Sequence, residues 1–209
     1  MEFIIRSLGQ ISYWVGRRRV FAAVPRGGVC AEIGVWRGDF SQRILDVLAP
    51  KELHLIDPWL FAPQFPRRWY GGSLARGQAD MDAIMESVRQ RFRAFPAVQI
   101  HRAASMAAVE QFPNNYFDWV YIDGDHSTSA VLADLEAWYP KLKPQGSLVL
   151  DDYYWRDEAG KRSVKAAVDA FLCSRPVGDC KTVAGQFILN VAGGHPVAKQ
   201  ASSFPQNSP

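Results

Sequence analysis

Two clusters of acidic residues each follow an apolar run, and together they could bind a metal ion. The first contains Asp123 in YIDGDH, and the second is the pair Asp151 and Asp152 in LVLDDYY. If the two runs are adjacent parallel strands, their carboxyl ends meet at one edge of a sheet, where three carboxylates repel one another unless a cation neutralises them. Oxygen ligands favour Mg²⁺ or a similar hard ion, with manganese or iron as alternatives. Asp125 or His126 could remove a proton from a substrate hydroxyl, and the sequence does not choose between them.

The metal prediction depends on the two clusters occurring together. A single acid at the end of a strand commonly begins a turn and stays solvated, and this simpler interpretation competes for each acid alone. A lone histidine is likewise more often structural, and His54, His101 and His195 are interpreted in that way. His126 stands out only because it lies beside the acids.

A second candidate site follows an earlier apolar run, where Glu32, Gly34 and Gly38 occur in EIGVWRG. Glycines just before a helix let the backbone approach a ligand and direct helix N–H groups toward it. The GxGxxG pattern of a dinucleotide pyrophosphate site is absent, because Glu32 stands two positions before Gly34 and would repel a phosphate. Asp57 follows about 20 residues later, where nucleotide-binding α/β folds place an acid against ribose hydroxyls. Each feature alone is also typical of a turn, but together they favour an adenosine-type ligand without a pyrophosphate.

Short apolar runs alternate along the chain with longer amphipathic ones, which is the pattern of a parallel sheet covered by helices on both faces. Five buried strands are predicted, at residues 29–34, 52–57, 97–101, 117–123 and 147–151. Helices are predicted at residues 39–48, 79–93, 129–141 and 163–173, and a short antiparallel pair at 181–183 and 186–191. Ligands of such sheets bind at the carboxyl ends of the strands, where both candidate sites fall.

The length of 209 residues suits one α/β domain, which we place at residues 28–191. A helical or apolar segment, residues 1–27, is expected before it, and a small, polar, disordered tail, residues 192–209, after it. Residues 58–95 interrupt the alternation with a loop rich in proline, tryptophan and tyrosine that leads into a helix. Because long loops of this kind are commonly lids or binding surfaces, we expect a lid-like insertion here.

The composition excludes several classes of protein. With 48% hydrophobic and 22% charged residues, the chain is neither disordered nor fibrous, and a formal net charge of +3 is too small to indicate nucleic-acid binding. Three cysteines without CxxC spacing favour a reducing compartment over a disulfide framework. The sequence has neither a signal-peptide pattern nor an uncharged apolar run of about 18 residues. We therefore expect a cytoplasmic protein that does not insert into membranes.

The residues of both sites resemble the class I S-adenosylmethionine-dependent methyltransferases, and among them the small metal-dependent O-methyltransferases of the macrocin and other sugar types. The resemblance is carried by CAEIGVWRGDFS at 30–41, LHLIDPW at 53–59 and FDWVYIDGDHSTSAVLADLEAWYPKLKPQGSLVLDDY at 117–153, and it spans roughly residues 28–191. It implies a Rossmann-like, doubly wound α/β fold with a seven-stranded, mostly parallel sheet whose last strand is antiparallel.

The resemblance also assigns roles to individual residues. Those around the cofactor are Glu32, Gly34 and Gly38 at the methionine part, Asp57 at the ribose and Ser105 near the adenine, where the acid that relatives often carry is missing. Those around the metal are Asp123, Asp151 and Asp152 as ligands, with Asp125 or His126 as the base.

The activity implied by the resemblance is transfer of a methyl group from S-adenosylmethionine to a hydroxyl of a sugar, glycoside or phenol, assisted by Mg²⁺ or another divalent cation. Relatives are often oligomeric, and the apolar residues 3–15 are a candidate interface, although they could equally pack on the domain itself. The family also includes cephalosporin-hydroxylase-like relatives.

The sequence disfavours three other function classes. A nicotinamide-dependent dehydrogenase is disfavoured by Glu32, and a nucleic-acid methyltransferase by the absence of an NPPY-type motif. A protein that binds S-adenosylmethionine or metal without catalysis is disfavoured because both acidic clusters are intact. Chelator-sensitive methyl transfer would separate that binding protein from an enzyme.

Overall fold

The computed structural model describes residues 19–192. Of the N-terminal segment predicted over residues 1–27, the described part includes a short 3-10 helix, η1 (Arg19–Ala22). The predictions for residues 1–18, including the candidate interface at 3–15, and for the tail from residue 193 onward lie outside the described residues.

The centre of the fold is a seven-stranded sheet in the order β3-β2-β1-β4-β5-β7-β6. Its strands are β1 (Val29–Ile33), β2 (Glu52–Asp57), β3 (Val98–Arg102), β4 (Phe117–Ile122), β5 (Leu142–Leu150), β6 (Cys180–Val183) and β7 (Gln186–Asn190). The strands from β3 to β5 pair in parallel, whereas β7 is antiparallel to its neighbours β5 and β6. The predicted Rossmann-like fold, with seven strands and an antiparallel last strand, is confirmed.

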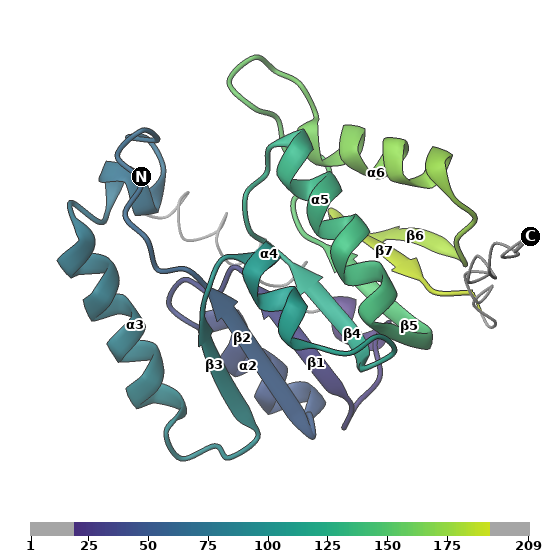
Figure 1. Cartoon of the computed structure of the whole chain (residues 1–209), viewed down its shortest axis with the longest axis horizontal. Helices are drawn as coiled ribbons and strands as arrows, with labels where there is room; N and C mark the ends of the chain where they lie inside the picture. Colours follow the sequence, from purple (N-terminus) through teal and green to yellow (C-terminus); the bar gives the residue numbers. More distant parts are fainter. Residues whose placement is uncertain (1–18, 193–209) are drawn as a thin grey trace, which may run out of the picture.

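Helices cover both faces of this sheet (Figure 1). They are α2 (Asp39–Leu48), α3 (Gln78–Phe92), α4 (Ser105–Ala108), α5 (Thr128–Trp138) and α6 (Ser163–Ser174). In Figure 1, α4, α5 and α6 lie in front of the sheet and α2 lies behind it. Two hydrophobic clusters fill the two spaces, one beneath α5 and α6 and the other beneath α2 and α3. Among the helices of residues 19–192, none is both long enough and apolar enough to cross a membrane.

The burial of the strands explains why they could be located from the sequence. All five residues of β1 are buried, and successive residues enter opposite clusters, Ala31 and Ile33 in one and Cys30 in the other. A strand buried on both faces is a continuous apolar run, because neither face meets water. The same argument holds for β4, where Trp119 and Val120 lie on opposite sides of the sheet.

β5 begins earlier than the predicted run at 147–151. Pro144 and Gly146 are poor strand residues, so local propensity does not favour a strand before Ser147. The structure accommodates them in an irregular pairing, with Leu142 opposite Phe117 and Ser147 opposite Trp119, while Gln145 adopts a φ of 65°. The additional residues form a bulge, which lets the strand continue past residues that a regular ladder excludes.

The insertion predicted over residues 58–95 contains a π-helical turn, η2 (Trp69–Ser73), followed by α3. Trp59 anchors its beginning, since this side chain is fully buried and its Nε1 donates to the backbone oxygen of Trp36 at 2.9 Å. In contrast, Leu60, Phe65, Trp69 and Leu74 are large apolar side chains that remain exposed. The insertion is therefore fixed at its base and exposes several large apolar side chains on its outer surface.

Candidate cofactor and metal site

The carboxyl ends of β1, β2, β4 and β5 are joined by backbone hydrogen bonds that continue the sheet past the last strand residues. Gly34 N donates to Ile56 O at 2.9 Å, Asp123 N to Ile33 O at 2.8 Å, and Asp151 N to Ile122 O at 3.0 Å. These bonds set the register of the residues that follow each strand. The acids after β4 and β5 are thus brought beside the glycine turn after β1.

Three side chains converge at this edge of the sheet. Asp123, His126 and Asp152 each offer a ligand atom, and these atoms lie within 4.8 Å of one another. His126 Nε2 is 3.2 Å from Asp152 Oδ2 and 3.8 Å from Asp123 Oδ1. Within residues 19–192, this is the one such group of three or more histidine, cysteine or acidic side chains. Two carboxylates and an imidazole are a donor set that suits a divalent cation, so the residues fit the expected metal.

Asp152 reaches this group through an unusual backbone conformation. Its φ is 53°, in the left-handed region that residues with a side chain rarely adopt. Trp155 N donates to Asp152 O at 2.8 Å, which closes a tight turn directly after β5. Backbone strain of this kind costs about 1–3 kcal/mol and occurs preferentially at functional sites.

Asp151, the other acid of the pair, is buried and has a different partner. Gln186 Nε2, at the start of β7, donates to Asp151 Oδ1 at 3.2 Å. Asp151 is 4% exposed and Gln186 is 1% exposed. The structure therefore brings together two of the three predicted metal ligands with a predicted base, His126, and places Asp151 against the last strand.

The charges of the site determine the protonation of His126. Burial by itself lowers the pKa of His126, but the hydrogen bond to Asp152 and the negative charges of Asp123, Asp152 and Asp151 together raise it above its ordinary value. The ring of His126 also contacts that of Trp155, with 5.3 Å between the ring centroids.

Asp125, the alternative base, is exposed and lies at the beginning of α5. Its Oδ1 accepts a hydrogen bond from Ser127 N at 2.8 Å, and Ser127 Oγ in turn accepts from Ala130 N at 3.3 Å as the cap of the helix. The charge of Asp125 also reaches the insertion, because together with burial it raises the pKa of Tyr70. Asp125 thus lies in the loop between β4 and α5, close enough to the insertion for its charge to act on Tyr70.

Gly34 and Gly38 have packing reasons to be glycines. Gly34 has a φ of 89°, and a Cβ there would lie 2.0 Å from the backbone oxygen of Asp123. Gly38 has a φ of 74°, and a Cβ there would lie 2.8 Å from the ring of Phe92. The turn after β1 can therefore lie directly against the acidic loop only because it has no side chain at Gly34.

Asp57 holds the same turn from the other side. Its Oδ2 accepts hydrogen bonds from Val35 N at 3.0 Å and Trp36 N at 2.9 Å, and its Oδ1 accepts from Trp59 N at 2.7 Å. Burial raises the pKa of Asp57, and these three bonds offset only part of that effect. The structure thus gives Asp57 a role in shaping the turn, and its predicted contact with a ribose stays a prediction.

The other two predicted cofactor residues are also held by the protein. Ser41 Oγ, in α2, donates to Glu32 Oε2 at 2.5 Å, and Glu32 is buried in β1. Ser105 Oγ accepts from Trp138 Nε1 at 2.8 Å and donates to Asp134 Oδ1, so it is joined to α5.

Asp134 is buried, and burial raises its pKa to about 6. Sequence reasoning missed Asp134, although an acid between Val131 and Leu135 on the apolar face of a helix is the signal that identifies it.

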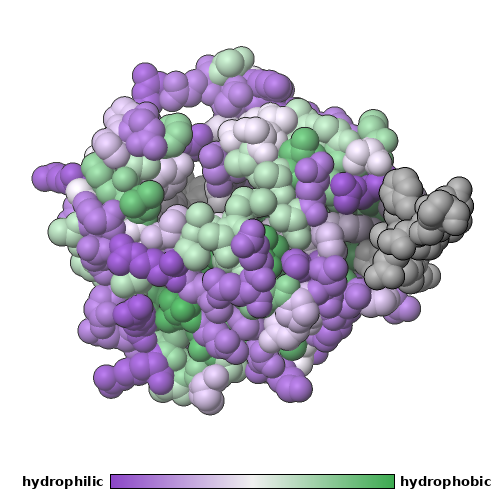
Figure 2. Space-filling model, in the orientation of Figure 1, coloured by the Kyte–Doolittle hydropathy of each residue, from purple (hydrophilic) through white to green (hydrophobic). Residues whose placement is uncertain are grey.

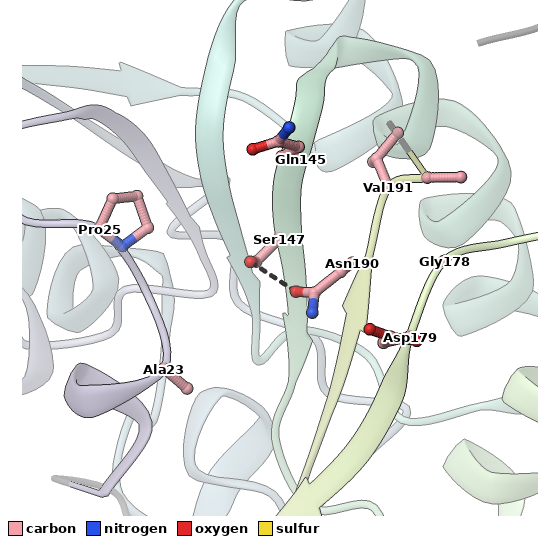
Figure 3. Close-up of a pocket in the computed structure, with 9 residues that line it drawn as sticks. Ala23, Pro25, Gln145, Ser147, Gly178, Asp179, Asn190 and Val191 are labelled. Carbon is pink, nitrogen blue, oxygen red and sulfur yellow. Dashed lines mark hydrogen bonds between the residues drawn. The ribbon is translucent and has the colours of Figure 1, made fainter. Parts of the chain in front are cut away.

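A separate pocket of about 540 Å³ opens at the opposite end of β5 (Figure 3). Its lining residues are Ala23, Pro25, Gln145, Ser147, Gly178, Asp179, Asn190, Val191 and Ala192. Ser147 Oγ donates to Asn190 Oδ1 there at 2.9 Å. Because ligands of open α/β sheets bind at the carboxyl ends of the strands, the edge with the acids remains the candidate site.

The strand order, the antiparallel β7, the glycine turn after β1 and the acid at the end of β2 together define the class I fold of S-adenosylmethionine-dependent methyltransferases. A family model described as a methyltransferase domain matches residues 31–153, which is more than half of the chain, and the chain belongs to that family. No curated protein matches the sequence significantly.

Several solved structures are similar to this fold. A Corynebacterium glutamicum protein superposes with a TM-score of 0.58 and 17% identity, over 91% of this chain and 82% of that one. The O-methyltransferase TomG from Streptomyces achromogenes, involved in tomaymycin synthesis and solved with S-adenosylmethionine, gives a TM-score of 0.57 and 15% identity, over 90% of this chain and 80% of TomG. A Staphylococcus aureus protein provisionally described as a caffeoyl-CoA O-methyltransferase gives a TM-score of 0.55 and 17% identity, over 89% of this chain and 83% of that one. At these identities the likeness concerns the fold.

Proposed function

We propose that this methyltransferase transfers the methyl group of S-adenosylmethionine to a hydroxyl oxygen of a small molecule, with the help of a divalent cation such as Mg²⁺. The acceptor class is a sugar, a glycoside or a phenol. The observation that carries the proposal is the convergence of Asp123, His126 and Asp152 beside the glycine turn after β1. A cofactor lying over that turn would have its methyl group near the acidic edge, where an acceptor oxygen could be bound and deprotonated.

In this proposal Asp123 and Asp152 hold the cation. Asp123 Oδ1 and Asp152 Oδ2 lie 3.8 and 3.2 Å from His126 Nε2, and one ligand atom from each of the three side chains lies within 4.8 Å of the other two, so the three groups can close around one ion with small side-chain adjustments. The role of Asp151 as a ligand stays a prediction, because its Oδ1 accepts a hydrogen bond from Gln186. In either role its negative charge strengthens the attraction of this edge for a cation.

The protein's own groups then perform three tasks. Asp57 fixes the backbone of the turn through Val35 and Trp36, so the surface on which the cofactor would lie is formed before binding. Asp125, or His126 where its Nε2 is not used as a ligand of the cation, accepts the proton of the acceptor hydroxyl. The insertion, with Tyr70 and Arg68 near the acidic loops, limits access of water to the site. When bound, the cofactor supplies an electrophilic methyl group and the cation lowers the pKa of the acceptor hydroxyl.

Titration calorimetry tests the proposal. Purified protein is titrated with S-adenosylmethionine and S-adenosylhomocysteine, each with Mg²⁺ and with chelator. The expected result is binding of both compounds, followed by methylation of hydroxylated acceptors that stops when chelator is added. If neither compound binds, the cofactor assignment is wrong, and if methylation continues at full rate in chelator, the cation assignment is wrong.

A further inference from the structure

Three segments that are distant in the sequence meet at Trp155. This residue follows the strained turn at Asp152, and the bond from its backbone N–H to Asp152 O directs the chain back toward the site. Its ring lies 5.3 Å from the ring of His126, in the loop after β4. The guanidinium carbon of Arg68, in the insertion, lies 4.7 Å from the centre of the same Trp155 ring. Trp155 therefore contacts both Arg68 of the insertion and His126, which lies beside Asp123 and Asp152 in the candidate metal site.

The segment that carries Arg68 is held firmly. Arg68 N donates to Phe65 O at 2.9 Å, while Gly71 N and Ser73 N both donate to Arg68 O at 3.1 Å. A Cβ at Gly71 would lie 2.0 Å from Phe65 O, so the turn is as tight as a glycine permits. The guanidinium is thus presented to Trp155 from a compact turn and not from an extended loop.

The neighbouring Arg67 makes a second contact between the same segments. Its Nη1 lies 3.5 Å from Glu158 Oε1, but both side chains are more than 70% exposed, with values of 83% and 75%. Exposed ion pairs contribute little. Figure 2 shows hydrophilic side chains crossing the top of the molecule above a hollow, at the end where the loop after β5 lies in Figure 1. Of the two contacts, the half-buried one through Trp155 is the one that reaches a site residue.

Filling of the core does not account for Trp155. It remains partly exposed, and it belongs to neither of the two hydrophobic clusters. Among residues 19–192, the ring of Trp155 contacts a histidine and an arginine and none of the aromatic side chains of the core. A tryptophan between a cation and a site imidazole is instead suited to fix the orientation of that imidazole, as residues around metal ligands do.

We propose that Trp155 is a positioning residue that holds the imidazole of His126 toward Asp123 and Asp152, and that Arg68 of the insertion holds Trp155 in place. The inference rests on the proposed function, because it concerns the cation that these three side chains would bind. It goes beyond that function, because the affinity of Asp123, His126 and Asp152 for a cation would then depend on the position of the insertion.

The test compares Mn²⁺ binding by calorimetry in the full-length wild-type protein and in Trp155→Ala, Trp155→Phe, Arg68→Ala and Arg68→Lys. Mn²⁺ alone is the probe. We expect Trp155→Ala to weaken binding about 10- to 100-fold, the range found when residues that orient metal ligands are removed. Arg68→Ala should weaken Mn²⁺ binding less than Trp155→Ala does. Trp155→Phe and Arg68→Lys should retain most of the wild-type affinity. Arg67→Ala is the matched control and should bind like the wild type.

A second measurement follows His126 without any metal. The chain has four histidines, so their ring signals can be assigned in NMR spectra with a His126→Gln variant. We expect one narrow set of His126 signals in the wild type and in Trp155→Phe, and broadened or doubled signals in Trp155→Ala. Melting curves of all variants separate loss of folding from loss of orientation.

The outcomes distinguish this inference from the proposed function. If Trp155→Ala melts at a lower temperature but keeps the wild-type Mn²⁺ affinity and narrow His126 signals, Trp155 is only structural and the inference is overturned. If Arg67→Ala weakens binding as much as Arg68→Ala, the insertion acts as a whole and not through Trp155, which also overturns it. If the wild type does not bind Mn²⁺, the cation of the proposed function fails, and the NMR comparison alone decides whether Trp155 orients His126.

Discussion

The position that a Cβ of Gly34 would occupy lies 2.0 Å from the backbone oxygen of Asp123, so the glycine turn and the acidic loop are in direct backbone contact. This contact joins the two candidate sites: the turn on which a cofactor would lie and the carboxylate that would bind a cation cannot move independently.

Gly34→Ala should displace the loop that carries Asp123. The added methyl group meets backbone that cannot yield, and the φ of 89° is unfavourable for alanine, so we expect a loss of about 2–4 kcal/mol of unfolding free energy together with weakened Mn²⁺ binding. Urea unfolding and calorimetry measure the two effects. Gly160→Ala is the matched control, because Gly160 has a φ of 76° but open space around it, and it should cost only about 1 kcal/mol. Equal losses in both variants would contradict the contact with Asp123.

Asp152→Asn should abolish cation-dependent methyl transfer while leaving cofactor binding largely intact. An amide keeps the shape of the side chain but removes the negative charge that attracts a cation. Titration with S-adenosylhomocysteine and a methyl-transfer assay with Mg²⁺ measure the two properties. Asp169→Asn, at an exposed ion pair on α6, should retain both. Full turnover of the Asp152 variant would exclude Asp152 as a ligand.

Asp57→Asn should disorganise the turn after β1. Three backbone N–H groups point at the Asp57 carboxylate, and an amide that places its NH₂ toward any of them leaves a buried donor without a partner. We expect a loss of about 1–3 kcal/mol of unfolding free energy and weaker binding of S-adenosylmethionine. Asp46→Asn, on the exposed side of α2, serves as the control for both measurements. Unchanged stability would show that the three bonds do not hold the turn.

Asp134 should make stability depend on pH. Burial raises its pKa in the folded protein to about 6, above the ordinary value of 3.8. The protonated form is thus favoured by folding, so this contribution to stability is complete below about pH 4 and is lost as the pH rises through 6. The difference in unfolding free energy between Asp134→Asn and the wild type should therefore shift in favour of the variant by on the order of 2–3 kcal/mol when the pH is raised from 4 to 7. Urea unfolding at the two pH values measures this shift. A pH-independent difference between the two proteins would refute the assignment.

Much of this fold could be predicted from the sequence because its strands are buried on both faces. Their apolar runs, separated by helical periodicity, located the parallel strands, and the turn residues Ala184 and Gly185 located the final antiparallel pair. The first residues of β5 could not be predicted in this way, because Pro144 and Gly146 are tolerated only through a bulge that depends on the neighbouring strand. Local propensity contains no information about such pairing.

The site was predictable to the level of strand ends and no further. The adjacent ends of β4 and β5 place Asp123 and Asp152 together, as the sequence suggested, but the left-handed conformation of Asp152 decides which of two consecutive acids points toward His126. The contact of Arg68 with Trp155 has no sequence signal, because it depends on how the insertion folds back. The structural interpretation of His54 and His101 agrees with their geometry, since His54 Nδ1 lies 3.0 Å from His101 Nε2. Burial also lowers the pKa of His54 to about 4.

The antiparallel direction of β7 has a consequence for how the protein is made. Because β7 runs opposite to β5, its first residue, Gln186, arrives at the carboxyl edge and binds Asp151, although it lies beyond the region that the methyltransferase family model covers. During synthesis on the ribosome, the acids and the glycine turn therefore emerge long before the residue that supports one of them. The hydrogen bond that Gln186 donates to Asp151 forms only when the final hairpin docks, so a nascent or truncated chain that ends before β7 should contain every candidate site residue and still lack this support of Asp151.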